Sequence, residues 1–369
     1  MSQPPFTKVI AALPATVPFV GPEAQERARG HGFRARIGAN ESVFGPSPKA
    51  VAAMAQAAAE VWKYSDPDNF ELIRAIADYH DVAPENVVII EGIDGGLGLT
   101  NRLFVSPGDS VVTSDGAYPT FNFHVAACGG QLIKVPFRDD KEDIEALLAA
   151  ATQHGARILY LTNPDNPMGS WWRSDDIDEL IRRLPGDTML ALDEAYIDTA
   201  PAGTAPAIDV SNPMVMRFRT FSKAYGMAGA RIGYCISEAG TIRQFEKVRN
   251  HYGINRIAQM GAVAALADQA YLTETVRRIA EARDRIADIA RANGLEPLPS
   301  ATNFVTIDCG RDGDYAREIL SGLLARDIFV RMPGVVPLDR CIRVGAGLPE
   351  DMALFEEALP EVLRSVAAA

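Results

Sequence analysis

The sequence predicts an α/β protein, with a mostly parallel sheet covered by helices on both faces and a smaller α+β domain. Strand-like and helix-like segments alternate from Val87 to about Ile236, which is the pattern of parallel strands joined by helical crossovers. The last third carries strand-like runs at residues 303–307 and 341–344, which is typical of a small α+β domain. With 369 residues, 47% of them hydrophobic, the chain is long enough for both domains.

Two predicted helices flank the alternating region. Ser47 and Pro48 supply an N-cap and a first-turn proline, and the apolar residues that follow fall on one helical face. A long amphipathic helical stretch is predicted from about Gln259 to Ala292, because its Ala-rich, charged sequence keeps isoleucines at helical spacing. This stretch links the large domain to the C-terminal one.

The order of these elements divides the chain into three segments. We expect an N-terminal arm that also completes the small domain, a large domain that carries the binding site, and a C-terminal small domain: residues 1–40, 41–255 and 256–369. No internal repeat or low-complexity linker interrupts them.

Lys223 is the most informative residue of the chain. It follows Ser222 and precedes a glycine-rich stretch that ends in Arg231. A lysine amine forms a Schiff base with a carbonyl, while a hydroxyl and a guanidinium hold a phosphate, so this run suits pyridoxal phosphate. Glycines at residues 91–96 follow the strand-like residues 87–90 and open a probable helix, whose backbone N–H groups make a further phosphate cradle.

The pyridine ring of that cofactor needs other groups, and these follow predicted strands. Asp193 comes after the apolar run 188–192, at the edge where open α/β sheets bind ligands. Its carboxylate can pair with the ring nitrogen and keep it protonated, so that the ring withdraws electrons. Tyr196 and Asn166 can donate to the ring's phenolic oxygen. An aromatic residue within 118–121 can stack on the ring.

These motifs together resemble the fold-type I, pyridoxal phosphate-dependent aminotransferases of classes I and II, and most closely the histidinol-phosphate aminotransferase branch. The matching stretches follow the family order: Gly38–Ser42, Gly45–Pro48, Tyr64–Pro67, Pro119–Phe121, Asn163–Gly169, Asp193–Tyr196, Ser222, Lys223, Arg231 and Ile342–Val344. The resemblance implies a large domain with a mostly parallel seven-stranded sheet flanked by helices, plus a smaller α+β domain. Met168 and Ser65 depart from the usual threonine and proline, and residues 14–22 differ from the usual N-terminal arm.

The resemblance also implies a cofactor site in which Lys223 bonds to pyridoxal phosphate and moves the proton between Cα and C4′. Asp193 and Tyr196 are the other catalytic residues. Phe121 stacks on the ring, and Tyr64 reaches the cofactor phosphate of a neighbouring subunit, which implies a homodimer. The residues that contact the cofactor within one subunit are then Ile93 and Asp94 through their backbone, Phe121, Asn166, Asp193, Tyr196, Ser222, Lys223 and Arg231.

For the substrate, the resemblance implies a carboxylate held in a bidentate grip by Arg343. Arg331 is expected to bind a second anionic group, and Asn40 also to lie at the substrate. The expected reaction is a ping-pong amino transfer from a donor, best matched by histidinol phosphate, to a 2-oxo acid such as 2-oxoglutarate.

Other reactions remain open from the sequence. An aromatic or other amino acid is an alternative donor, and a decarboxylase of a phosphorylated amino acid is an alternative enzyme on the same cofactor. Arg343 favours loss of the Cα proton, since it holds the carboxylate in the ring plane. A non-enzymatic regulator of this fold normally carries a basic DNA-binding domain, and no such sequence precedes Asn40.

Composition narrows the partners and the compartment. The net charge of −12 and the pI near 5.0 argue against nucleic acid and anionic membranes as partners. No secretory leader or membrane-spanning run is visible. The five histidines show no metal-ligand spacing, so no metal is expected. The four cysteines are widely spaced, as expected for core residues in a reducing cytoplasm: Cys128, Cys235, Cys309 and Cys341.

Overall fold

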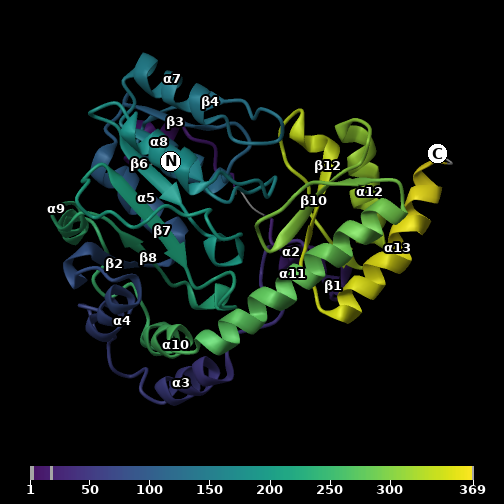
Figure 1. Cartoon of the computed structure of the whole chain (residues 1–369), viewed down its shortest axis with the longest axis horizontal. Coiled ribbons are helices and arrows are strands. Elements are labelled where there is room, and N and C mark those ends of the chain that lie inside the picture. Colours follow the sequence, from purple (N-terminus) through teal and green to yellow (C-terminus); the bar gives the residue numbers. More distant parts are fainter. Residues whose placement is uncertain (1–3, 17–19, 368–369) are drawn as a thin grey trace.

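The computed structural model describes residues 4–16 and 20–367, which form a large domain and a small domain. The two lie side by side, and helix α11 (Gln269–Ala292) runs from one to the other (Figure 1). Residues 17–19, within the arm segment that departs from the family pattern, lie outside the described residues. The C-terminal end lies on the small domain (Figure 1).

The large domain contains a seven-stranded sheet in the order β2-β8-β7-β6-β5-β3-β4. Its strands are β2 (Val87–Ile90), β3 (Ser110–Ser114), β4 (Gln131–Val135), β5 (Ile158–Thr162), β6 (Met189–Asp193), β7 (Val215–Thr220) and β8 (Gly233–Ile236). Strand β8 pairs antiparallel with both β2 and β7, while the other pairs are parallel. The predicted mostly parallel sheet is therefore confirmed.

Helices cover both faces of this sheet because its central strands are apolar on both sides. On β5, Ile158 and Tyr160 belong to one core, under α5 (Gly92–Phe104) and α6 (Pro119–Ala127). Leu159 and Leu161 alternate with them and belong to the opposite core, under α7 (Ile144–His154) and α8 (Ser174–Arg182). The helices cover the faces of the sheet but not its edge, where the carboxyl ends of β5 and β6 lie.

The helical stretch predicted from Gln259 to Ala292 is two helices, α10 (Arg256–Leu266) and α11. The helical stretch is interrupted at Asp268, which is buried and forms an ion pair with Lys49 at 3.1 Å. Helix α10 packs on α3 (Pro48–Ala58) and α4 (Phe70–His80) of the large domain, whereas α11 contributes to the small-domain core. The start of α11 still packs in the large-domain core through Leu272, so the domain boundary expected at residue 256 stays a prediction.

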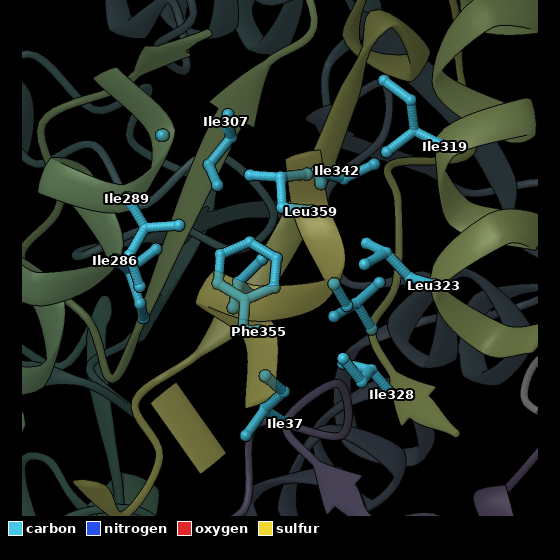
Figure 2. Packing of buried hydrophobic residues seen from close by; sticks show 14 of the residues in the cluster. Ile37, Ile286, Ile289, Ile307, Ile319, Leu323, Ile328, Ile342, Phe355 and Leu359 are labelled. Atoms are coloured by element: carbon cyan, nitrogen blue, oxygen red, sulfur yellow. The ribbon is translucent and has the colours of Figure 1, made fainter. Parts of the chain in front are cut away.

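The small domain has one antiparallel sheet and one short parallel pair. The sheet contains β9 (Glu296–Pro297), β10 (Phe304–Asp308) and β12 (Cys341–Gly345), and the pair contains β1 (Ala35–Arg36) and β11 (Ile328–Phe329). Phe355 lies at the centre of the core, among isoleucines from several elements (Figure 2). Ile37 from the N-terminal segment joins this core, so the segment completes the small domain (Figure 2).

The remaining helices complete the two domains. They are α1 (Lys8–Ala12), α2 (Pro22–Arg29), α9 (Ala239–Arg243), α12 (Gly313–Ala325) and α13 (Pro349–Ala367), with 3-10 turns at Pro84–Asn86, Ile197–Thr199, Ala228–Ala230, Gln244–Lys247 and Leu338–Arg340. Within the described part of the chain, no helix is both long and apolar enough to cross a membrane. All four cysteines are free thiols, and three of them are buried.

Candidate active site

A cavity of about 360 Å³ opens at the carboxyl ends of β5, β6 and β7. The small domain contributes Arg343 from β12 to its wall. Ten of the predicted site residues line this cavity: Asn40, Ile93, Asp94, Asn166, Asp193, Tyr196, Ser222, Lys223, Arg231 and Arg343. Tyr64, Phe121 and Arg331 are not among its lining residues.

Asp193 is the last residue of β6, and each of its carboxylate oxygens accepts a hydrogen bond from the protein. Tyr160 Oη donates to Oδ2 at 2.8 Å, and the Ala195 N–H donates to Oδ1 at 3.0 Å. Burial raises the pKa of Asp193 to about 6, against the lowering effect of these hydrogen bonds. The group is therefore largely ionised at neutral pH and can bind a cationic ring nitrogen.

Lys223 lies in the loop after β7, and its Nζ donates to the backbone oxygen of Asn40 at 3.0 Å. Burial, and then the positive charge of Arg343, lower the pKa of Lys223 to about 8. An appreciable share of the amine is thus uncharged near neutral pH. The amine faces the same cavity as Asp193.

Tyr196 and Asn40 form a buried pair beside this amine. Asn40 Nδ2 donates to Tyr196 Oη at 2.9 Å, and burial raises the pKa of Tyr196 to about 12. Asn40 has a φ of 56°, a left-handed conformation that asparagine tolerates better than most residues. Its buried Oδ1 has no hydrogen-bond partner within the described residues, as expected of an atom awaiting a ligand.

A cup whose groups suit a phosphate forms where α5 begins beside Arg231. Gly92 has a φ of 72°, which favours glycine, and a Cβ on it would displace the guanidinium of Arg231. Ile93 and Asp94 follow in the first turn of α5, where backbone N–H groups are free to bind an anion. Thr220 Oγ1 donates to Ser222 Oγ at 2.9 Å, which leaves the Ser222 hydroxyl proton available to a phosphate.

Arg343 presents a buried guanidinium from the small-domain side. It donates to Asn166 Oδ1, and its Nε has no partner within the described residues. Burial lowers the pKa of Arg343 to about 10, so the group remains charged at neutral pH. This arrangement suits an anionic substrate group. Asn166, expected at the cofactor's phenolic oxygen, thus also contacts the predicted substrate arginine.

Arg331 lies beside Arg343 but outside the cavity lining. Their backbones form a bridge, with Arg343 N–H donating to Arg331 O at 2.6 Å. The Arg331 guanidinium donates to the backbone oxygen of Val20 in the N-terminal segment at 2.6 Å. The structure therefore places this arginine between the arm and the site.

The expectation that Phe121 stacks on the cofactor ring stays a prediction, because the side chain does not line the cavity in this structure. Phe121 is fully buried and stacks on Tyr160, with ring centroids 4.1 Å apart. Helix α6 begins at Pro119 and turns Phe121, like Val125 one turn later, toward the sheet. Tyr118 at the N-cap lines the cavity instead. Pro119 was a signal for this, since a first-turn proline marks the start of the helix and makes Tyr118 its N-cap.

Tyr64 points to the surface of its own subunit. Its side chain is 81% exposed and packs on Tyr252, with ring centroids 4.9 Å apart. The expected contact with a neighbouring subunit's cofactor remains a prediction, compatible with this outward position.

The lining residues fit pyridoxal phosphate in chemical type and in place. The cup at Gly92 and Arg231 suits its phosphate, Asp193 suits its ring nitrogen, and the amine of Lys223 suits its aldehyde. Among the described residues, no group of three or more His, Cys, Asp or Glu side chains is arranged to hold a metal ion.

Comparisons with known proteins agree with this geometry. The family model described as aminotransferase class I and II matches residues 36–358. A solved structure of histidinol-phosphate aminotransferase from Sinorhizobium meliloti in complex with pyridoxal-5'-phosphate is 53% identical, covers 99% of both chains and superposes with a TM-score of 0.96. Histidinol-phosphate aminotransferase from Moorella thermoacetica is 32% identical over 98% of this chain and 93% of that protein. Histidinol-phosphate aminotransferase 2 from Pseudomonas aeruginosa is 33% identical over 89% of each. The chain therefore belongs to the class I and II aminotransferases.

Proposed function

We propose that this chain is a pyridoxal phosphate-dependent aminotransferase that takes its amino group from histidinol phosphate and passes it to a 2-oxo acid such as 2-oxoglutarate. One observation carries the proposal: a half-buried lysine, a buried aspartate and a cup that suits a phosphate line one cavity. The similarity to the Sinorhizobium meliloti enzyme supports the cofactor and the donor.

The cofactor, when bound, supplies an aldehyde and an electron-withdrawing pyridine ring. Lys223 Nζ would condense with the aldehyde, with loss of water, and would later carry the proton between Cα of the substrate and C4′. Asp193 would hold the proton on the ring nitrogen, and Tyr196 and Asn166 would hold the phenolic oxygen. Tyr118 lines the cavity where a ring can stack.

Two neighbouring arginines support an anionic donor and acceptor. Histidinol phosphate carries a phosphate, and a 2-oxo acid carries a carboxylate. The buried Arg343 suits either group in a bidentate grip, and Arg331 stands next to it for a second anion. Local arginines are needed because the net charge of −12 repels anions at long range.

We also propose that the active unit is a cytoplasmic homodimer in which Tyr64 completes the partner's site. Residues 61–70 carry four large apolar side chains that are more than half exposed: Val61, Trp62, Tyr64 and Phe70. Such a patch is typical of an interface. The four free thiols are compatible with a reducing compartment.

The covalent claim can be tested by reducing the loaded protein with borohydride and mapping the modified peptide. We expect the cofactor on Lys223. In Lys223→Ala we expect a folded protein that binds the cofactor without a covalent bond, checked by circular dichroism and mass spectrometry. A Lys223→Ala variant that transfers amino groups at the wild-type rate contradicts the proposal.

The donor is tested by a titration of the loaded enzyme, in which the absorption of the bound cofactor is followed with one amine at a time. We expect histidinol phosphate to convert the cofactor at far lower concentration than glutamate or aromatic amino acids. Conversion by an aromatic amino acid instead would keep the aminotransferase and change the donor. Release of carbon dioxide from a phosphorylated amino acid would indicate a decarboxylase.

A further inference from the structure

The hydroxyl of Tyr160 lies beneath the cavity, against the carboxylate that is expected to face the cofactor ring. Tyr160 is on β5, its side chain is fully buried, and it does not line the cavity. Its hydroxyl donates to Asp193 Oδ2 at 2.8 Å. It therefore acts on any ligand only through Asp193.

Packing fixes this hydroxyl in place. The Tyr160 ring stacks on Phe121 of α6, with centroids 4.1 Å apart and an interplanar angle of 19°. With the Ala195 N–H on the other oxygen, each oxygen of Asp193 holds one donor from the protein. A carboxylate oxygen accepts two hydrogen bonds, so each oxygen keeps a lone pair for a group in the cavity. The plane of the carboxylate is thus set before a ligand arrives.

The same hydrogen bond favours the charged form of Asp193. Burial raises the pKa of this carboxyl, and the hydrogen bonds from Tyr160 and Ala195 oppose that rise. Burial, and then the charge of Asp193, raise the pKa of Tyr160 well above its ordinary value, so its hydroxyl stays a donor at working pH. The other titratable groups that act on or face Asp193 are Lys223, Glu194, Tyr118 and Tyr196.

We propose that Tyr160 is a positioning residue for amino transfer: it orients the Asp193 carboxylate and holds it ionised, so that the cofactor's ring nitrogen keeps its proton. The inference rests on the proposed function, because it requires pyridoxal phosphate in this cavity. A residue with a merely structural role would leave the ring nitrogen unaffected.

The test uses Tyr160→Phe, which keeps the stack on Phe121 and removes only the hydroxyl. Wild type and variant are loaded with pyridoxal phosphate carrying nitrogen-15 in its ring, and the resonance of that nitrogen is followed with pH. We expect the variant's resonance to move toward the unprotonated value. We expect kcat to fall about tenfold, the size expected for the loss of one hydrogen bond to a charged group, with KM for the donor unchanged.

The matched control is Tyr234→Phe, which removes another buried hydroxyl on the same sheet, 2.8 Å from a ring nitrogen of His80. It should leave the resonance in place. In an Asp193→Asn background, Tyr160→Phe should add no further change, as a double-mutant cycle requires. Circular dichroism checks that each variant folds. Should Tyr160→Phe not fold, 3-fluorotyrosine at this position keeps the hydroxyl as a stronger donor and should move the resonance the opposite way.

Three results would overturn the inference: an unmoved resonance in Tyr160→Phe, an equal change in Tyr234→Phe, or an effect that persists with Asp193→Asn. The wild-type protein separates this inference from the proposed function. If wild type takes up no cofactor, the proposed function fails. If it does and Tyr160→Phe matches it, only the role of Tyr160 fails.

Discussion

At the scale of single residues, burial sets the proton affinities that the proposed reaction needs. Lys223 has its pKa lowered to about 8, so its amine loses its charge as the pH rises through 8. We predict that the rate of covalent cofactor capture by the cofactor-free protein rises with pH through this midpoint, measured by stopped-flow absorption. Arg343→Gln removes the neighbouring positive charge and should move the midpoint upward, with no substrate present to complicate the comparison. A midpoint near 10 in the wild type contradicts the prediction.

The buried carboxylate of Asp193 suits the proposed function but should lower the stability of the cofactor-free protein. When the pKa of an acid is higher in the folded than in the unfolded chain, the folded protein loses stability as the pH rises between the two values. The loss persists at higher pH. For Asp193 that window runs from about 4 to about 6. The cofactor-free Asp193→Asn protein should therefore be more stable than wild type at pH 8 by roughly 1–3 kcal/mol, with the gap closing near pH 4. Urea unfolding at both pH values measures this, and a less stable variant at pH 8 counts against it.

Individual residues differ in how far the sequence could place them. Lys223 and Asp193 could be predicted because each follows its own strand, and the ends of parallel strands meet at one edge. The sequence left the choice between Tyr118 and Phe121 open, because the first residue of α6 decides which of the two faces the cavity. The bond from Asn40 to Tyr196 joins residues 156 apart and depends on how the domains pack.

At the scale of elements, the first turn of α5 works only with a glycine at position 92. Gly92→Ala combines a positive φ with a contact of 2.4 Å between the new Cβ and Arg231 Nη2. We predict that its cofactor dissociation constant rises at least about tenfold, because Arg231 must leave the phosphate cup. Fluorescence titration of the cofactor-free protein measures it.

The control for that prediction is Gly155→Ala at the C-cap of α7. Gly155 also has a positive φ, of 56°, but a Cβ there meets nothing within 4 Å. It should lower stability by about 1 kcal/mol and leave cofactor binding unchanged. Equal binding losses in both variants would mean that backbone strain alone, and not the contact with Arg231, is responsible.

Elements also show where periodicity misleads. The stretch from residue 259 to 292 reads as one helix because its apolar spacing continues without a proline or glycine near the break. Helix α10 packs in the large-domain core, whereas α11 begins in that core at Leu272 and reaches the small-domain core at Ile286 and Ile289. Local sequence does not encode which core a helix joins.

At the scale of the whole molecule, the site depends on contacts between distant segments. Arg343 of β12 reaches Asn166 of the large domain, although 177 residues separate them. The small domain therefore supplies the arginine predicted to bind the substrate, while the large domain supplies the groups predicted to bind the cofactor. The resemblance predicted which residues bind the cofactor and which bind the substrate. Composition and periodicity predicted only an α/β domain and a smaller α+β domain.

The last prediction concerns the proposed homodimer and tests whether Tyr64 acts in its own subunit or in its partner's. Lys223→Ala and Tyr64→Ala should each be nearly inactive alone. If Tyr64 acts across the interface, a mixed dimer has one site with an intact Lys223 and the partner's intact Tyr64, and one site that lacks both. Random mixing of equal amounts then restores roughly a quarter of the wild-type sites, because half of the dimers are mixed and each has one whole site. If Tyr64 acts within its own subunit, every site in the mixture lacks one group and no activity returns. Activity is measured after subunit exchange, with sedimentation to confirm that dimers form. The 81% exposure of Tyr64 and its absence from its own cavity lining favour the first result.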